Sequence, residues 1–201
     1  MIAIIDYDAG NIKSVENAFS ALGGEVTLTA DPDVVAKADK VVLPGVGVFG
    51  DARQKLDKRG MDQAVYDTIK KGTPFLAICV GLQLLFDESE ESPGAKGLSV
   101  FGGKIIRIPS APGIKVPQIG WNSLHIEREC RILKGIEEGA FVYFVHSYYL
   151  KAQDEDIVIA STEYSTHIHA AVEKDNVFAT QFHPEKSGTV GLNILKNFME
   201  L

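Results

Sequence analysis

The first half of the chain alternates short, mainly apolar runs with segments that have helical periodicity. The apolar runs lie at residues 2–5, 26–29, 40–43 and 75–78. Helical patterns lie at residues 11–19, with Asn11 as a candidate N-cap, and at residues 61–71. Short apolar strands separated by helices are typical of a parallel sheet that is covered by helices on both faces.

After about residue 98 the helical patterns become rare and strand-like runs follow one another. These runs lie at residues 104–108, 123–126, 141–145 and 157–160. Residues 170–172 and 177–181 predict a hairpin, and a last helix is expected over residues 190–199. No linker is long enough to separate two domains. We therefore expect residues 1–201 to form one α/β domain: an open, mostly parallel sheet with helices on both faces, flavodoxin/Rossmann-like, with an antiparallel extension in the second half.

Composition excludes several classes of protein. The 201 residues are 45% hydrophobic and 23% charged, as in ordinary globular domains rather than disordered chains. The net charge of −7 argues against a nucleic acid or an anionic membrane as partner, because both bind cationic surfaces. No apolar run approaches the ~20 residues that span a bilayer, and Asp6 comes too early for a signal peptide. Two cysteines cannot form a disulfide framework, so we expect a cytoplasmic protein.

Cys79 lies where the apolar run 75–78 gives way to a helical segment. Its neighbours two positions away, Ala77 and Gly81, are small, as a nucleophile on a tight strand-to-helix turn requires. Such a turn exposes the sulfur at the carboxyl edge of the sheet, beside a helix N-terminus that favours the thiolate. A buried structural cysteine is the common alternative, and this motif alone does not decide between the two.

His183-Pro184-Glu185 follows the apolar run 178–182 and completes a candidate catalytic set. Pro184 ends regular strand pairing. A catalytic imidazole needs a carboxylate that sets its tautomer, and Glu185 can reach back to His183 along an extended segment. His-x-Glu pairs are common on solvated surfaces, but the combination with a cysteine elbow is rare. The pattern indicates a Cys-His-Glu nucleophilic site.

Residues 44–50, Pro-Gly-Val-Gly-Val-Phe-Gly, follow the third apolar run. Three glycines in this segment allow backbone N–H groups to turn toward a ligand. An oxyanion hole needs such donors, and the amide of Val80 would be a second one. Taken alone the segment would be an ordinary flexible turn, and it lacks the Lys-Ser/Thr of a phosphate-binding loop. The remaining histidines have no metal-ligand spacing, and no metal site is expected.

These three elements and further motifs extend from residue 6 to residue 187 and resemble the class I, triad-type glutamine amidotransferases. The more specific motifs are Asp6-Tyr7-x-x-Gly10-Asn11, Pro44-Gly45-Val46-Gly47-x-Phe49-Gly50, Gln83-Leu84-Leu85-Phe86, Pro117-Gln118-Ile119-Gly120-Trp121-Asn122, Phe144-Val145-His146-Ser147-Tyr148 and Gln181-Phe182-His183-Pro184-Glu185-Lys186-Ser187. Within the family the chain looks most similar to the glutaminase subunits of imidazole glycerol phosphate synthases. Ala77 and Val80 depart from the usual Gly and Leu of that elbow, which could change the rate.

The resemblance implies hydrolysis of L-glutamine to glutamate and ammonia through a cysteinyl thioester, without a cofactor. Cys79 would be the nucleophile, His183 the base and later the acid, and Glu185 the residue that orients the ring. The oxyanion would be held by the Val80 amide and by an amide of the 45–47 loop, Val46 or Gly47. The residues implied in glutamine binding are Gly47, Gln83, Glu91, Ser147 and Tyr148.

The resemblance also implies a partner. Ammonia would pass through a channel to a (β/α)8-barrel cyclase subunit, with which the chain would form a heterodimer in histidine biosynthesis. The matching interface positions are Gly10, Asn11, Trp121, Asn122, Tyr143 and Lys186. Little hydrolysis is expected without this partner and its nucleotide, and the 44–47 loop is the expected switch because glycine lets a peptide turn over easily.

Three alternatives remain open at this point. The chain could be the glutaminase of another triad amidotransferase, although Gly120-Trp121-Asn122 and the Tyr7/Gly10-Asn11 motif argue against it. It could be a stand-alone cysteine hydrolase, such as a peptidase or a γ-glutamyl hydrolase, which would turn over without a partner. It could also be a binding module with a structural Cys79, which the complete Cys-His-Glu set disfavours.

Overall fold

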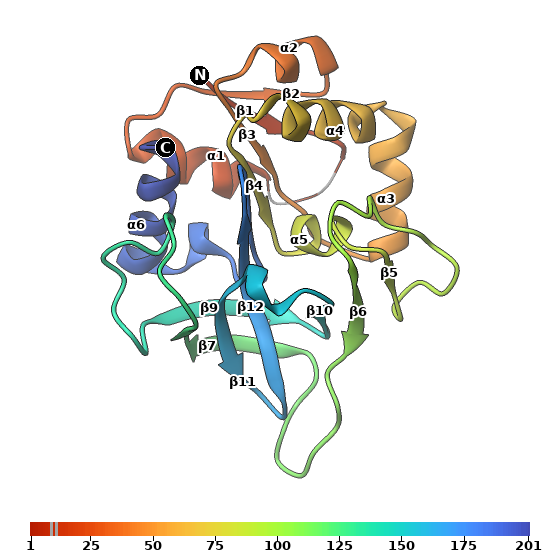
Figure 1. Ribbon diagram of the computed structural model, residues 1–201, viewed down its shortest axis with the longest axis vertical. Coiled ribbons are helices and arrows are strands. Elements are labelled where there is room, and N and C mark those ends of the chain that lie inside the picture. The colour runs from red at the N-terminus through yellow and green to blue at the C-terminus, as the bar shows by residue number, and fades with distance from the viewer. Residues whose placement is uncertain (9, 11) are drawn as a thin grey trace.

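A computed structural model describes residues 1–8, 10 and 12–201 of the chain. The centre of the molecule is a mixed sheet that Figure 1 shows nearly edge-on, with helices on either side. Its parallel part has the strand order β2 (Val26–Thr29), β1 (Ile2–Ile5), β3 (Lys40–Leu43), β4 (Phe75–Ile78) and β13 (Val177–Thr180). These strands are mostly buried, which confirms the predicted parallel α/β sheet.

Two groups of helices cover the parallel strands. On one side α1 (Ile12–Ala21) packs against α6 (Gly188–Met199), where the rings of Phe19 and Phe198 lie 6.2 Å apart. On the other side lie α3 (Phe49–Lys58), α4 (Met61–Lys71) and α5 (Val80–Leu84) (Figure 1). The short α2 (Pro32–Lys37) packs on α4. None of the helices in the described ranges is both long and apolar enough to cross a membrane.

Helix α4 illustrates how sequence sets the element boundaries. It spans the predicted residues, Met61–Lys71, between two glycines in left-handed conformations. The N–H of Gly72 bonds to the carbonyl of Ile69 and ends the helix. Asp62 in the first turn and lysines in the last turn complement the helix dipole.

Helices α2 and α3 were not predicted, although α2 carries a clear start signal. Asp31 caps α2 by accepting from the N–H of Asp33, and Pro32 occupies the first turn. Helix α3 begins at Phe49, inside the glycine-rich segment 44–50 for which the sequence predicts a loop. Glycine at residue 50 lowers helix propensity, but the helix buries Phe49, Ala52 and Leu56 in the core, and tertiary packing prevails.

The second half forms the predicted antiparallel extension. From β13 the sheet continues through β12 (His167–Lys174), β10 (Tyr148–Ala152), β6 (Gly103–Arg107) and β5 (Glu88–Ser89), while β11 (Val158–Glu163) pairs with β12 and with β8 (His125–Ile126). Short 3-10 turns are η1 (Glu155–Ile157) and η2 (Pro184–Lys186). The β12–β13 hairpin confirms the predicted turn, with Lys174 opposite Val177.

A separate two-stranded antiparallel sheet consists of β7 (Gln118–Ser123) and β9 (Phe141–His146). The strand predicted over 123–126 is confirmed in part, since β8 covers His125–Ile126 and β7 ends at Ser123. The longer strand at residues 118–122 was not predicted. The reason is an inverted pattern, since the polar Gln118 is buried while Ile119 and Trp121 are exposed.

Candidate active site

Cys79 occupies the turn between β4 and α5. Its φ of 56° and ψ of −110° lie in a region that L-residues rarely adopt and that is found at functional turns. The N–H of Cys79 donates to the Thr180 carbonyl over 2.7 Å, which ties the turn to the end of β13. A methyl group on Gly81 would overlap the Leu43 carbonyl oxygen, so the elbow requires glycine there.

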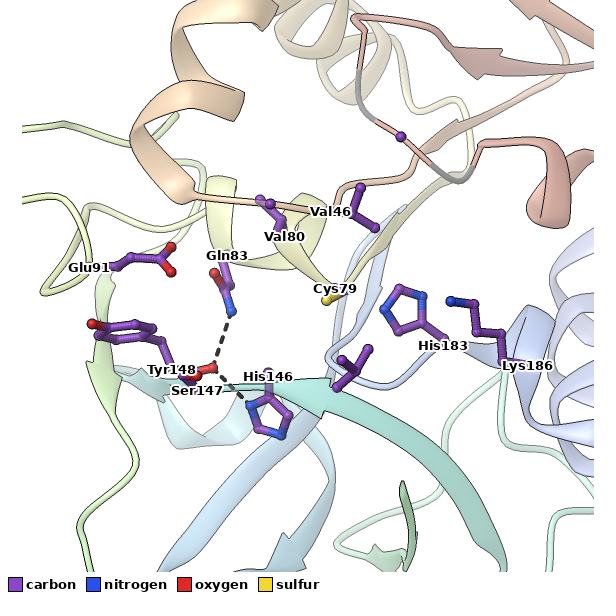
Figure 2. A pocket seen from close by; sticks show the side chains of 13 residues that line it. Val46, Cys79, Val80, Gln83, Glu91, His146, Ser147, Tyr148, His183 and Lys186 are labelled. Atoms are coloured by element: carbon purple, nitrogen blue, oxygen red, sulfur yellow. Dashed lines mark hydrogen bonds between the residues drawn. The ribbon is translucent and has the colours of Figure 1, made fainter. Parts of the chain in front are cut away.

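The two departures from the usual elbow are accommodated within the fold. Ala77 is fully buried in β4 and lies in register with Leu43 and Ala179 of the neighbouring strands, so its methyl is part of the sheet packing. Val80 is also buried and begins α5. The Val80 side chain does not lie between Cys79 and His183 (Figure 2).

His183 and Glu185 form a buried pair at the end of β13. Nδ1 of His183 lies 2.7 Å from Oε1 of Glu185, and the two side chains are 2% and 1% exposed. Because a carboxylate accepts, it sets the ring proton on Nδ1 and leaves Nε2 for the reaction. Nε2 has no hydrogen-bond partner within the described part of the chain, and the ring faces the Cys79 sulfur (Figure 2).

The protonation of His183 is governed by this environment. Burial lowers the pKa of the ring, but its interactions with Cys79 and Glu185 outweigh burial and raise the pKa to about 10. A ring that keeps its proton beside a sulfur favours the thiolate–imidazolium pair, which is the reactive form of a cysteine nucleophile. The sequence hypothesis that Cys79 and His183 meet therefore agrees with the fold.

A cavity of about 360 Å³ opens at the sulfur, a size typical of sites for small molecules. Its wall contains Cys79 and His183 together with every residue that was implied in glutamine binding: Gly47, Gln83, Glu91, Ser147 and Tyr148. Figure 2 shows these side chains around the cavity, with Gln83 and Tyr148 on one side of the sulfur and His183 and Lys186 on the other. Segments far apart in the sequence therefore converge on one hollow.

The glycine-rich loop lies against the elbow with a carbonyl toward it. The Val80 N–H donates to the Gly45 carbonyl oxygen over 3.4 Å, and the Tyr7 hydroxyl donates to the Pro44 carbonyl over 2.9 Å. Burial, followed by the proximity of Cys79, raises the pKa of Tyr7, which keeps this hydroxyl protonated. The Val80 amide is thus engaged, and an oxyanion hole needs the 45–46 peptide to turn so that an N–H replaces the carbonyl.

Gln83 and Glu91 are both engaged in contacts with the protein. Nε2 of Gln83 donates to the Tyr148 carbonyl and to Oε1 of Gln181, each over 3.2 Å. Oε2 of Glu91 accepts from the N–H of Phe49 over 2.8 Å and so caps the N-terminus of α3. These bonds fix the two side chains at the cavity wall, where both line the hollow.

Three residues at the site have no predicted role in the sequence analysis. Gln181 donates from Nε2 to the Cys79 sulfur at 3.7 Å. His146 lines the cavity and contacts the Tyr148 carbonyl from Nδ1 at 2.9 Å, and Tyr7 holds Pro44 as described. Each belongs to a motif quoted above, but the motifs do not indicate which of their polar side chains point toward the sulfur.

Trp121 leads a group of exposed residues on the small β7–β9 sheet. Its side chain is 55% exposed, and its ring packs edge-on against Tyr143 at 6.1 Å. Because side chains alternate along a strand, one face of the sheet carries Ser123 and five apolar or aromatic residues. We call these five the outer β7–β9 face: Ile119, Trp121, Phe141, Tyr143 and Val145. Ile119 is 64% and Phe141 57% exposed, and neither was predicted.

The other predicted interface positions have different surroundings. Asn122 uses its side chain internally: Nδ2 donates to the Glu163 carbonyl over 3.0 Å, and Oδ1 accepts from the N–H of Ser123. Gly10 and Lys186 line the cavity near the catalytic pair. Asn11 lies outside the described residues, both as an interface position and as a helix cap.

Residues 1–8, 10 and 12–201 contain no cluster of His, Cys, Asp and Glu that could hold a metal ion. Cys130 is a free thiol in a partly buried position, and burial raises its pKa to about 11. It is therefore a poor nucleophile compared with a cysteine at a helix N-terminus.

Comparison with known proteins agrees with this geometry. The family model for glutamine amidotransferase class-I matches residues 3–201. The chain is 51% identical to imidazole glycerol phosphate synthase subunit HisH of Methanothermobacter thermautotrophicus, covering 100% of this chain and 98% of that protein. It is 44% identical to the subunit HisH of Methanocaldococcus jannaschii, covering 100% of both.

Solved structures support the fold at lower identity. A crystal structure of a glutamine amidotransferase matches with a TM-score of 0.77 at 18% identity, covering 100% of this chain and 98% of that one. The glutaminase domain of Trypanosoma brucei CTPS matches with a TM-score of 0.70 at 18% identity, covering 99% and 93%. The chain belongs to the class I glutamine amidotransferases and, within them, to the family of imidazole glycerol phosphate synthase subunit HisH.

Proposed function

We propose that this chain is the glutaminase subunit of an imidazole glycerol phosphate synthase and that residues 1–201 act as one amidotransferase domain. The observation that carries the proposal is the convergence of Cys79, the His183–Glu185 pair and Gln83 on one cavity. The match to the class I glutamine amidotransferases and the full-length similarity to HisH subunits support glutamine as the substrate. The two free cysteines fit a reducing compartment, and we infer the cytoplasm as the site of action.

In the proposed reaction the Cys79 sulfur attacks the side-chain amide carbon of glutamine. The thiol proton is already on Nε2 of His183 in the thiolate–imidazolium pair, and this nitrogen protonates the departing amide nitrogen, which leaves as ammonia. A water molecule, deprotonated by Nε2, hydrolyses the thioester and releases glutamate. Glu185 holds the ring by its 2.7 Å bond to Nδ1 and stabilises the imidazolium.

The tetrahedral intermediates carry a negative oxygen that needs backbone donors. The Val80 amide and an amide of the glycine loop, Val46 or Gly47, are the proposed donors. The contact between Val80 N–H and the Gly45 carbonyl occupies one of them in the structure. Gly47 has a φ of 94°, and glycine on the loop allows the peptide to turn at low energy. We infer that partner binding selects the turned state.

The residues that would hold glutamine surround the elbow. We infer that the Gln83 side chain and the backbone of Ser147–Tyr148 receive the substrate on one side of the sulfur. Glu91 supplies a negative charge within the cavity, which complements the substrate's ammonium group. Gly47 lets the loop approach the substrate closely because it has no side chain.

The proposed partner is a (β/α)8-barrel cyclase subunit that docks on the outer β7–β9 face. A solvent-exposed group of Ile119, Trp121 and Phe141 is unusual for a monomer and typical of the centre of an interface. Gly10 and Lys186 are proposed contacts nearer the cavity, where ammonia would leave. Asn11 is a further proposed contact by its motif alone. A stand-alone hydrolase would have no need of such an apolar face.

The test is a pair of cysteine variants in the complex with a cyclase subunit. Cys79→Ala should abolish glutamine-dependent synthesis, whereas synthesis with added ammonium salt should continue, because only the ammonia source is lost. Cys130→Ala is the matched control and should retain both activities. Survival of glutamine-dependent synthesis in Cys79→Ala would refute the assignment of the nucleophile, and loss of both activities would refute the division of labour.

A further inference from the structure

The side chain of Gln181 is fully buried between the nucleophile and the glutamine-binding wall. It follows β13 and precedes His183 by two residues. Its Nε2 donates to the Cys79 sulfur at 3.7 Å, and its Oε1 accepts from Gln83 Nε2 at 3.2 Å. A buried amide with both ends engaged on site residues has little freedom to rotate.

The direction of these bonds is fixed by one backbone carbonyl. The Tyr148 oxygen can only accept, so Gln83 must turn its Nε2 toward it. The second hydrogen of that Nε2 points to Gln181, whose facing atom must then be the oxygen. The nitrogen of Gln181 is left for the sulfur, so its N–H groups rather than its oxygen face Cys79.

The same carbonyl connects this chain of bonds to β7. Nδ1 of His146 lies 2.9 Å from the Tyr148 oxygen, so the ring proton is on Nδ1. Nε2 of His146 lies 3.0 Å from Oε1 of Gln118. Since a ring with its proton on Nδ1 can only accept at Nε2, the pairing requires the Gln118 amide to turn its Nε2 toward the ring. Gln118 and His146 are opposite one another in the β7–β9 ladder, and the next residue of β7, Ile119, belongs to the outer β7–β9 face.

We propose that Gln181 is a positioning residue that stabilises the Cys79 thiolate, and that the bonds from Gln181 through Gln83, the Tyr148 carbonyl and His146 to Gln118 couple the thiolate to strand β7. A thiolate is a stronger acceptor than a thiol or a thioester, so an N–H donor favours the thiolate before attack and as it leaves. We call this chain of hydrogen-bonded groups the relay. Each of its members is buried or part of the cavity wall, away from competing water.

The relay has two discrete states at each amide, since a side-chain amide presents either its oxygen or its nitrogen. Movement of β7 upon contact at Ile119 or Trp121 would shift Gln118 and therefore the bond at His146. Gln83 and Tyr148 also line the glutamine cavity, so substrate contacts reach the same atoms. This consequence for catalysis depends on the proposed glutaminase function, whereas the effect on the thiol does not.

The experiment measures the rate at which iodoacetamide alkylates Cys79 in the isolated chain from pH 5 to pH 10, resolved from Cys130 by peptide mass spectrometry. Gln181→Met keeps the volume and removes the donor, and Gln181→Asn keeps a buried amide but withdraws it from the sulfur. Both should move the midpoint of the pH–rate profile for Cys79 alkylation upward by about one pH unit, a tenfold slower rate on the acid side of the profile, and retain the rate at high pH. Cys130 serves as an internal reference with unchanged rates.

Gln118→Met tests the connection to β7 independently of the Gln181 variants. It should move the midpoint of the Cys79 profile upward by about half a pH unit, a threefold slower rate on the acid side, since a coupled partner acts at reduced strength. Gln63→Met, an exposed glutamine on α4, is the matched control and should change nothing. A profile midpoint within about 0.3 pH unit of the parent for both Gln181 variants, a twofold change on the acid side, overturns the positioning role. A fall that persists at high pH indicates altered access and also overturns it.

An unchanged profile in Gln118→Met overturns the coupling to β7. Glutaminase assays of the same variants in the complex separate this proposal from the proposed function. Gln181→Met should lower kcat with little change in KM, because it acts on the sulfur rather than on substrate binding. A parent chain without glutaminase activity whose Cys79 alkylation still depends on Gln181 would refute the function and leave the positioning role intact.

Discussion

At the scale of single residues, Gly191 of α6 packs closely against the segment that carries the proposed catalytic pair, although it does not line the cavity. A methyl group there would overlap the Pro184 carbonyl oxygen and the Ser187 side chain. Both belong to the segment that carries His183 and Glu185. Close packing of α6 on this segment therefore restricts the positions that His183 and Glu185 can adopt.

Gly191→Ala is expected to lower the free energy of unfolding by about 1–3 kcal/mol, as overpacking does, and to reduce glutaminase activity of the complex. Urea unfolding and steady-state assays measure the two effects. Asn193→Ala, at an exposed position of the same helix, is the control and should preserve both. Wild-type stability and activity in Gly191→Ala would show that α6 does not position the pair.

His146 predicts a pH dependence of stability. Burial, assisted by the nearby His183, lowers its pKa to about 4 although the Tyr148 carbonyl favours protonation. In the unfolded chain the ring titrates near its ordinary value of about 6.5, so the unfolded state binds the extra proton first. The stabilisation is present above about pH 6.5 and is lost as the pH falls toward 4.

Lowering the pH from 7.5 to 5 should remove about 2 kcal/mol of this contribution, measured by urea unfolding. His183 has a raised pKa and acts in the opposite sense, with stability lost as the pH rises from about 6.5 toward 10. The comparison must therefore be with His146→Asn, which keeps a donor for Tyr148 but does not titrate. Equal pH dependence in parent and variant would contradict a neutral buried His146.

At the scale of elements, the outer β7–β9 face predicts a separation of stability and binding. Trp121→Ser and Phe141→Ser remove exposed side chains, so unfolding free energies should change by no more than about 0.5 kcal/mol. Affinity for the cyclase subunit should fall by about 2 kcal/mol for Trp121→Ser, roughly thirtyfold, as for an interface anchor. Isothermal titration calorimetry measures this change.

Leu28→Ser is the control for the face, since Leu28 is 37% exposed on β2, a strand of the opposite sheet edge. It should not alter binding. If Trp121→Ser and Phe141→Ser bind as tightly as the parent chain, the cyclase docks elsewhere and the outer β7–β9 face has another role.

Some of the strands and helices could be predicted from the sequence, and others could not. Strands β1, β3 and β4 and helix α4 were predictable because each is a short apolar run or a regular amphipathic pattern with clear ends. Strand β7 was not, because its exposed side is apolar and its buried side polar. Strands are recognised in a sequence by the rule that apolar residues are buried and polar residues exposed. A strand whose apolar side chains are exposed for a proposed partner breaks this rule.

For the site, the sequence predicted which residues take part but not how they contact one another. Cys79 and His183 could be located as residues that end apolar strands, but only the pairing of Ile78 with Thr180 brings those two ends together. The role of Gln181 depends on the direction of three hydrogen bonds that no linear pattern encodes. The contact of Val80 with Gly45 likewise describes a state of a loop, which spacing cannot indicate.

At the scale of the whole molecule, the sheet brings the thiol, the imidazole and the proposed glutamine-binding wall to one edge, and the β7–β9 sheet lies beside that edge (Figure 1). The proposed catalytic set of Cys79, His183 and Glu185 is assembled, whereas the proposed oxyanion donor, the Val80 amide, is occupied by the Gly45 carbonyl. We therefore expect that the isolated chain has a reactive nucleophile but an incomplete oxyanion hole, which partner binding completes.

The most direct test is the rate of glutamate formation from glutamine by the chain alone and by the chain with a barrel cyclase and its nucleotide. We expect a rise of about 10²–10³-fold in the complex, the usual effect of an oxyanion donor, that disappears in Cys79→Ala. The same rate with and without the partner, or no hydrolysis in the complex, would contradict it.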